Sequence, residues 1–544
     1  MNSTRQFPHS GLTWLALLIG GFATVASAGD ALPDDAALQA AGARIGLISI
    51  DSRQIFDLDD PAERKLLFRL ANRLHSRTRE SVIRAQLLFK SGDAYSGRLL
   101  QETERNLREL HFLREPSVRA IAWHDGLVDI NVETHDVWTL QVGPSFGRSG
   151  GTNSSSLSFE DKNLLGFGKT LIFEVDHTID RDSNIVEWRD PSIYGSRWQN
   201  DVYLSDSDDG HERRLDVWRP FFALDTRRSY GLSLDDLERT DTRYQLGTAY
   251  DSYYHTLHSA GLYAGWSRGL QAGRTRRLTV GWSVARDEFR PTIATVAALP
   301  ADRDLSYPYV RLDWVRDEFK TTRDLELIER TEDVQFGLNC TLLAGAVSKR
   351  WGADRNALPL QAVGSYGHEF SDRQQLFVSA SYQGRIEAGE SRDQLISFSA
   401  AWYLRTAPRW LTHAKISGAR GSRLDLDHYL SLGGDNGLRG YPLRYQLGTG
   451  ITQIKLEERL FTGKSLFRLF DIGAAAFFDA GRVHGANPLG APDLGWLRDV
   501  GIGLRFGNNR SAIGNVIHVD LATPLDRTTN VRGVQWLVST EASF

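Results

Sequence analysis

From Gly143 to Phe544 the chain is built of runs of about ten residues in which apolar and polar side chains alternate. Gly-, Asp- and Asn-rich breaks separate the runs, and helical periodicity is absent. Successive side chains of a strand point to opposite faces, so each run predicts a strand with one apolar and one polar face. A closed barrel would remove the exposed edges that so many strands would otherwise leave. The pattern therefore predicts a mainly β protein whose residues 143–544 form a transmembrane antiparallel β-barrel.

Length and composition fit this fold class. At ~25 residues for a strand and its connection, the region holds about sixteen strands. Fifty glycines, 14 tryptophans, 17 tyrosines and 25 phenylalanines suit strands that face lipid on one side and a wet lumen on the other. A soluble β-sandwich can share this composition, so the motifs and the C-terminus must decide between the two.

The N-terminal segment, the single cysteine and the net charge limit the cellular location and the kinds of partner that we expect. Residues 1–28 have the form of an export signal, with Arg5 before a mostly apolar run and Ala26-Ser27-Ala28 as a cleavage site. An uncleaved anchor is the rival interpretation, although the run is short for a span of ~20 residues. Cys340 is the only cysteine, which excludes an internal disulfide. A net charge of −4 without a basic stripe argues against a nucleic-acid partner.

Residues 44–142, after a linker at 29–43, predict a small α+β domain, because their periodicity changes several times. The expected elements are a strand at 44–50, helices at 61–74, 78–89 and 96–110, and strands at 117–123 and 127–133. Thr78 is a candidate helix cap, and Asp125-Gly126 predicts a hairpin turn. This order resembles the periplasmic polypeptide-transport-associated (POTRA) domain, most specifically between Phe89 and Phe112. A generic α+β module is the alternative.

Two short motifs carry the strongest functional signal. The first is Leu438-Arg439-Gly440-Tyr441 behind Gly433 and Gly434, and the second is Phe477-x-Asp479-x-Gly481. Both resemble motifs of the outer-membrane protein-assembly and two-partner-secretion barrels, the BamA/TamA-like superfamily of bacterial surface antigens. The resemblance implies a sixteen-stranded barrel with the first motif on a loop folded back into it. It also implies that Arg439 meets the carboxylate of Asp479 on the inner wall.

These residue types suit such a contact. The planar guanidinium of Arg439 can donate two hydrogen bonds to one carboxylate. Gly440 tolerates positive φ and would let the backbone approach the wall, while the ring of Tyr441 can pack on it. In a wet lumen the ion pair would contribute only ~1 kcal/mol, so its expected role is to fix the loop. The alternative is an exposed turn with an unpaired arginine.

The last strand-like run places Trp536 and Val538 on the same face as the terminal residue, Phe544. By resemblance to such barrels, this strand is the signal for insertion of the chain itself. Alternation also points Glu458 towards lipid, where a charge in the middle of the bilayer costs a few kcal/mol. Glu458 is therefore expected near the membrane rim or at a bulge.

An enzymatic interpretation rests on Gly265-Trp266-Ser267-Arg268-Gly269, which matches the nucleophile elbow of hydrolases. That elbow requires a helix directly after the strand, whereas another strand is expected beyond Gly273. Ser267 is therefore not expected to be catalytic. The histidines show no metal-ligand spacing, and no metal or other cofactor is expected.

The resemblance implies a non-enzymatic barrel of the bacterial outer membrane, with its N-terminal domain in the periplasm, that inserts or translocates other polypeptides. Its expected partners are unfolded outer-membrane or secreted polypeptides, outer-membrane lipids, and accessory periplasmic proteins or lipoproteins. Two alternatives stay open. One is a two-partner-secretion pore for a single dedicated exoprotein, and the other is a passive porin, which needs neither a POTRA domain nor an inward loop.

Overall fold

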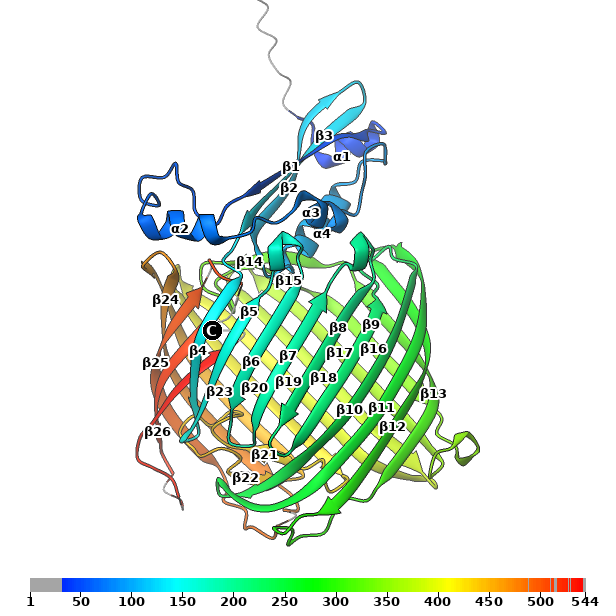
Figure 1. Ribbon diagram of the computed structural model, residues 1–544, viewed down its shortest axis with the longest axis vertical. Coiled ribbons are helices and arrows are strands. Elements are labelled where there is room, and N and C mark those ends of the chain that lie inside the picture. The colour runs from blue at the N-terminus through cyan, green and yellow to red at the C-terminus, as the bar shows by residue number, and fades with distance from the viewer. Residues whose placement is uncertain are drawn as a thin grey trace, which may run out of the picture.

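The computed structural model describes residues 32–487, 489–508, 510–512, 516–526, 528 and 530–541. The predicted export signal at 1–28 and the terminal Phe544 lie outside the described residues. A small N-terminal domain lies over one mouth of a large β-barrel (Figure 1). No helix within the described residues is long and apolar enough to cross a membrane.

The N-terminal domain packs helices against a three-stranded sheet of order β1-β3-β2, in which β1 runs parallel to β3. Its elements are α1 (Asp35–Ala40), β1 (Arg44–Arg53), α2 (Leu66–Leu74), α3 (Glu80–Gln86), α4 (Gly97–Arg108), β2 (Leu113–His124) and β3 (Leu127–Asp136). The small helix-and-sheet domain predicted from the sequence is confirmed. Its apolar core includes Leu38 of α1, so part of the predicted linker at 29–43 belongs to the domain.

The sequence predicts Thr78 as the cap of α3, and this prediction is wrong. The cap position is Arg79, which makes no side-chain cap bond. Thr78 instead receives a hydrogen bond on its hydroxyl from Asn163 Nδ2 (2.8 Å), and its backbone N–H donates to Asp136 (2.7 Å). Because Asn163 follows the second barrel strand, this buried residue joins the domain to the barrel.

Twenty antiparallel strands close the barrel within the described residues, so the prediction of sixteen is wrong. They are β4 (Leu140–Ser149), β5 (Thr152–Asp161), β6 (Thr170–His177), β7 (Asp182–Asp190), β8 (Gln199–Ser207), β9 (Gly210–Arg219), β10 (Arg228–Gln245), β11 (Thr248–Gln271), β12 (Arg274–Pro291), β13 (Arg303–Arg316), β16 (Gly337–Gly345), β17 (Ala357–Ser371), β18 (Gln374–Glu387), β19 (Glu390–Ala407), β20 (Trp410–Ser422), β23 (Gly450–Leu466), β24 (Phe470–His484), β25 (Leu497–Asn508), β26 (Val516–Pro524) and β27 (Gln535–Glu541).

The miscount has a physical reason. Several hairpins turn through two residues with positive φ, as at Gly150-Gly151, Leu246-Gly247 and Ala272-Gly273. Such turns match the twist of the flanking strands and need no longer loop. A strand with its connection is therefore shorter than the value assumed from the sequence. In addition, β4 begins at Leu140 and crosses Gly143-Pro144, so the barrel starts before the expected boundary at 143.

The two faces of the barrel strands differ as the alternation predicts. Neighbouring strands β10 to β13 expose Leu232, Leu262, Leu278 and Leu312 on the outside. Glu458 of β23 also lies on the outer face, next to the exposed Leu456 and opposite the buried Glu457. Its carboxylate accepts a hydrogen bond from the Thr412 hydroxyl of β20 (2.6 Å). The irregularity in this strand lies further on, between Phe461 and Ser465.

The barrel closes through a weak seam between its first and last strands, β4 and β27. Within the described residues, only Val538 and Arg148 pair across it, whereas β26 pairs with β27 along the whole of 516–522. Aromatic contacts supplement this pairing. The Trp536 ring stacks on Phe146 at 6.3 Å and lies 4.8 Å from the Arg148 guanidinium carbon.

Candidate functional site

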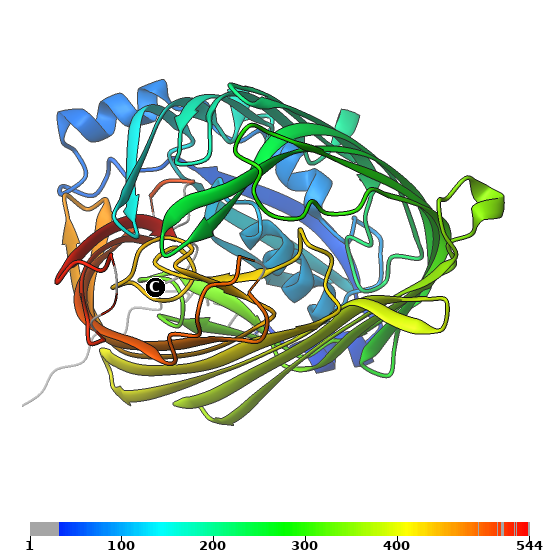
Figure 2. The ribbon, with the colours of Figure 1, turned by 90° about the horizontal axis from the view of Figure 1, so that it is seen from below.

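The motif Leu438-Arg439-Gly440-Tyr441 lies on the connection between β20 and β23, at the mouth remote from the N-terminal domain. This connection crosses the barrel opening (Figure 2) and contains the short strands β21 (Leu430–Leu432) and β22 (Gln446–Gly448), which pair with each other. We call residues 423–449 the inward loop. Leu438, Tyr441 and Tyr445 are fully buried and pack on Val483 and Leu497 of the wall.

Close packing explains the glycines of the inward loop. A Cβ atom on Gly440 would lie 2.7 Å from Asp499 Cβ and 3.1 Å from Pro524 N. Gly433 and Gly434 likewise leave no room for a side chain, because backbone atoms of the loop face them directly. None of the three has positive φ, so the expected role of Gly440 in a left-handed turn is not what the structure uses. Glycine here permits close approach of two backbones.

The structure brings Arg439 and Asp479 together. Arg439 Nε and Nη2 donate to Asp479 Oδ2 and Oδ1 at 2.7 and 2.9 Å. Arg439 Nη1 also donates to Glu457 Oε1 at 2.9 Å and lies 3.5 Å from Asp520 Oδ2. The guanidinium carbon stands 3.4 Å from the centre of the Phe477 ring, a cation–π distance. One arginine of the loop thus meets carboxylates from β23, β24 and β26.

These groups are buried, which the sequence had not indicated. Asp479 is fully buried, Asp520 is 2% exposed and Glu457 is 8% exposed. The wet-lumen estimate of ~1 kcal/mol for the pair therefore does not apply, since it belongs to solvated ion pairs. Removing one partner of a buried pair leaves an uncompensated charge and typically costs about 3–5 kcal/mol. Arg439 therefore fixes the inward loop to the barrel wall, and we call this arginine the clamp.

Further arginines extend the site along the inner wall. Arg505 of β25, fully buried, pairs with Asp520. Arg459 of β23 donates from Nε to Glu457 Oε2 (3.1 Å) and from Nη1 to the Leu325 carbonyl (2.9 Å). We call the set that alternates in sign the charge network; it consists of Arg439, Glu457, Arg459, Asp479, Arg505 and Asp520.

Leu325 belongs to a hairpin that fills the barrel from the opposite side. The connection between β13 and β16 forms the two-stranded sheet β14 (Phe319–Arg323) and β15 (Thr331–Gln335). We call residues 317–336 the plug hairpin. Its tip residues Leu325 and Ile328 are buried against Tyr403, Phe461 and other side chains of the wall. The charge network thus links the inward loop at one mouth with the plug hairpin at the other.

The plug hairpin is also attached to the N-terminal domain. Arg108 of α4 donates from Nε and Nη2 to the two carboxylate oxygens of Asp333 at 2.7 and 2.9 Å. The Arg105 guanidinium lies 3.7 Å from the centre of the Phe319 ring. Within the hairpin, Glu332 Oε1 accepts the backbone N–H of Leu325 (2.9 Å). Burial raises the pKa of the Glu332 carboxyl to about 7.

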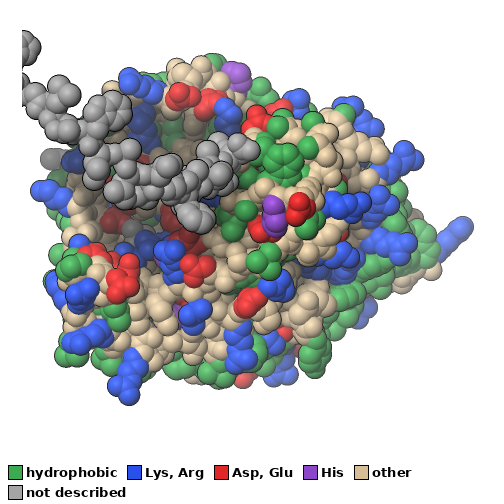
Figure 3. Space-filling model, turned by 90° about the horizontal axis from the view of Figure 1, so that it is seen from above, with side chains coloured by type: hydrophobic (Ala, Val, Ile, Leu, Met, Phe, Trp, Pro, Cys, Tyr) green, Lys and Arg blue, Asp and Glu red, His purple; other side chains and the backbone are tan. Residues whose placement is uncertain are grey.

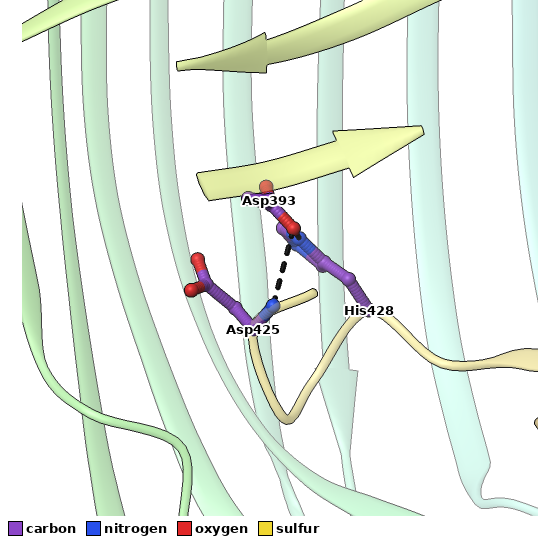
Figure 4. Close-up of side chains that lie close together, drawn as sticks. All are labelled: Asp393, Asp425 and His428. Carbon is purple, nitrogen blue, oxygen red and sulfur yellow. Dashed lines mark hydrogen bonds and ion pairs between the residues drawn. The ribbon is translucent and has the colours of Figure 1, made fainter. Parts of the chain in front are cut away.

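A second polar cluster holds the inward loop to the wall. His428 Nδ1 lies 2.9 Å from Asp393 Oδ1, and the Asp425 backbone N–H donates to the same carboxylate (Figure 4). The ligand atoms of Asp393, Asp425 and His428 lie within 4.8 Å of one another, a spacing that would suit a metal ion. However, Arg385 donates to both oxygens of Asp425 at 2.8 and 2.9 Å and supplies the positive charge itself.

Of the remaining predicted residues, only Gly481 lies beside Arg439. Ser267 is inside β11 and is followed by β12 rather than a helix, so its surroundings are not those of a nucleophile elbow. Gly481 packs against Leu432 and Leu438 of the inward loop. Trp536 and Val538 lie on β27 at the seam.

Comparison with known proteins gives matches to solved structures only, since no family model and no curated protein matches the chain. BamA from Haemophilus ducreyi lacking POTRA domains 1–3 is 12% identical, with a TM-score of 0.40 over 91% of this chain and 84% of that chain. CdiB from Acinetobacter baumannii is 11% identical, with a TM-score of 0.45 over 92% and 73%. CdiB from Escherichia coli is 15% identical, with a TM-score of 0.46 over 92% and 76%.

At such low identities and TM-scores, the matches carry no information about what this chain does. The site described above, by contrast, consists of this chain's own residues.

Sequence reasoning missed two partners of Arg439, Glu457 and Asp520, and it missed Arg505, which pairs with Asp520. A signal for Glu457 was available, because Glu457 and Arg459 share the inner face of a strand whose outer face carries Leu456. Charged residues on an inner face are common, however, and nothing in the sequence ranks one above another. The plug hairpin could not be predicted either, because the sequence pattern of its two short strands is like that of a hairpin in the barrel wall.

Proposed function

We propose that the chain is an outer-membrane β-barrel that inserts or translocates other polypeptides, with the N-terminal domain in the periplasm. The observation that carries this proposal is the seam. A closed barrel needs pairing along every strand, yet β4 and β27 share one paired position within the described residues. Opening this seam would expose two strand edges to the membrane. An unfolded outer-membrane strand could add to such an edge through backbone hydrogen bonds.

The N-terminal domain supports the same role. The edge strands of its sheet are β1 and β2, and within the described residues no further strand pairs with them beyond an isolated bridge between Arg44 and Ala94. The remaining length of these edges can receive an extended segment of a client by strand addition. A cavity of about 750 Å³ lies between this domain and the barrel mouth. Phe112 of the domain, Trp218 of the barrel and Leu327 of the plug hairpin contribute to its lining. A client held at the sheet edge would therefore enter next to the plug hairpin.

The inward loop and the plug hairpin give the barrel two closures and so support a controlled passage rather than a permanently open pore. The clamp holds the first closure and the Arg108–Asp333 pair connects the second to the N-terminal domain. Outer-membrane lipids would surround the apolar outer face, and accessory periplasmic proteins or lipoproteins would deliver clients. The mechanism requires no covalent chemistry.

Locking the seam tests the proposal. Arg148→Cys with Val538→Cys, in a Cys340→Ala background, places two thiols at the paired position of β4 and β27. Directly opposed Cβ atoms are about 4.5–5.5 Å apart, close enough for a reversible cross-link. Ser399→Cys with Ser417→Cys, a pair within the continuous β19–β20 pairing, is the matched control.

We expect the seam cross-link to abolish client insertion and reductant to restore it, while the control cross-link has no effect. The readout is the profile of outer-membrane and secreted proteins in cells carrying each variant. Loss of insertion with intact export of one dedicated protein would favour the two-partner-secretion alternative. An unchanged protein profile, with solute flux that survives removal of residues 44–136, would identify a porin and contradict the proposal.

A further inference from the structure

We propose that α2 is a membrane-surface helix, whose leucines enter the periplasmic leaflet of the outer membrane beside the barrel. This inference rests on the proposed membrane location of the barrel. The helix exposes Leu66, Leu67, Leu70 and Leu74, which are 73%, 75%, 47% and 62% accessible to solvent. Four adjacent, mostly exposed leucines on one short helix are unusual for a surface that faces only water.

The helix has three distinct faces. At about 100° per residue, the four leucines fall within about 100° of arc. Phe68 lies on the opposite side, Ala71 lies between Phe68 and the leucines, and both pack against the rest of the molecule. Between these two faces lie the exposed cations Lys65, Arg69 and Arg73, and the helix contains no acidic residue. The three cations form no ion pair within the described part of the chain.

The buried face fixes the helix rigidly at the barrel mouth. The Phe68 ring stacks on Phe56 at 4.3 Å, and both pack with Leu469 of the β23–β24 turn. Arg510, in the β25–β26 turn, donates to the Ile55 carbonyl (2.7 Å) and to Glu63 (2.9 Å). Within the described residues, these contacts leave the leucine face without a covering element.

The position of α2 indicates what covers it. The helix lies just above the barrel mouth (Figure 1), and seen from below it extends beyond the ring of strands (Figure 2). The end of β23 and the turn after it, whose Leu469 packs with the helix, expose Leu466 and Phe467. Lys and Arg side chains gather around the rim of the molecule on the side of the N-terminal domain (Figure 3). Apolar side chains of the helix and of this turn therefore lie together at the barrel mouth, beside a cationic border.

This arrangement fits a phospholipid leaflet. Leucines would enter the acyl region while the cationic face meets lipid phosphates, as in helices that lie in the plane of a membrane. A water-soluble protein partner would not need these leucines to lie at the end of the barrel strands. The helix would thus hold the periplasmic leaflet next to the seam, where a client strand would enter.

Site-specific fluorescence on the full chain tests the inference. In a Cys340→Ala background, single cysteines at Leu70→Cys, Ile121→Cys and Leu262→Cys carry an environment-sensitive nitrobenzoxadiazole label. Ile121, 57% exposed on β2 of the N-terminal domain, is the control for a residue in water. Leu262, 59% exposed on β11, is the control for a lipid-facing barrel residue. The chain is reconstituted in phosphatidylethanolamine–phosphatidylglycerol vesicles, with heat-modifiable migration as the check on folding.

We expect spin-labelled lipids to quench the labels at positions 70 and 262, and aqueous iodide to quench the label at position 121. Replacing phosphatidylglycerol with phosphatidylcholine should reduce the lipid quenching at position 70 alone. A label at position 70 that responds to iodide as position 121 does would overturn the inference. Protection from both quenchers would overturn it too, because a protein surface or a second copy would then cover α2. A label at position 262 that escapes lipid quenching would refute the membrane location itself.

Discussion

Replacing Arg439 with alanine should release the inward loop. The substitution removes one guanidinium from among Asp479, Glu457 and Asp520, and these three carboxylates then remain buried without it. Breaking a buried ion pair from one side typically costs about 3–5 kcal/mol. We expect a loss of that size in the free energy of unfolding.

The structure also predicts that Asp479→Asn destabilises the protein less than Arg439→Ala does. Asp479→Asn removes one negative charge, but Arg439 keeps Glu457 at 2.9 Å and Asp520 at 3.5 Å. The loss should therefore be nearer that of a charged hydrogen bond, about 1.5–3 kcal/mol. Asp479→Asn also removes one of the carboxylates that Arg439→Ala leaves uncompensated. The double variant should consequently be less destabilised than the sum of the two single variants, with a coupling of about 0.5–3 kcal/mol.

The measurement is unfolding by urea in lipid vesicles, followed by the loss of heat-modifiable migration in electrophoresis. Protease cleavage within residues 423–449 reports release of the loop separately. Arg286→Ala is the matched control, because Arg286 donates two hydrogen bonds to Asp304 but is largely exposed. Ion pairs in water contribute little, so this variant should behave like the parent.

Two results would refute this reasoning. Additive losses in the double variant would mean that Arg439 and Asp479 do not act as a pair. A loss for Arg439→Ala no larger than that for Arg286→Ala would mean that the clamp does not hold the loop.

Three further outcomes are expected. Gly440→Ala should cost about 1–3 kcal/mol in the same unfolding assay, because its Cβ would lie 2.7 Å from Asp499 Cβ; a variant as stable as the parent would contradict the packing argument. The plug hairpin should loosen as pH rises from about 4.5 to about 7, because burial raises the pKa of Glu332 to about 7 and the folded state then holds its proton more tightly than the unfolded chain. Hydrogen exchange at the Leu325 amide, corrected for intrinsic rates, measures this, and Glu332→Gln should abolish the pH dependence. Deleting Phe544 should leave the chain in the periplasm, so a normal yield in the outer membrane would disprove its role as the insertion signal.

Much of the fold could be predicted because it depends on local pattern. Alternation along a strand decides which side chains face outwards, and Leu456 and Glu457 lie on the faces that this rule assigns. The change of period after residue 142 separated the helical domain from the barrel. The approach of Arg439 to Asp479 came from the resemblance of two short motifs, not from periodicity.

Tertiary structure decided what depends on how strands are counted and closed. Two-residue turns such as Ala272-Gly273 allow twenty strands where an average spacing suggested sixteen. Whether a hairpin joins the wall or folds into the lumen depends on its packing partners, so β14 and β15 could not be placed from sequence. The burial of Arg439 arises in the same way. Its environment is built by β23, β24 and β26, and their side chains meet Arg439 only once these strands have paired and the inward loop has folded against them.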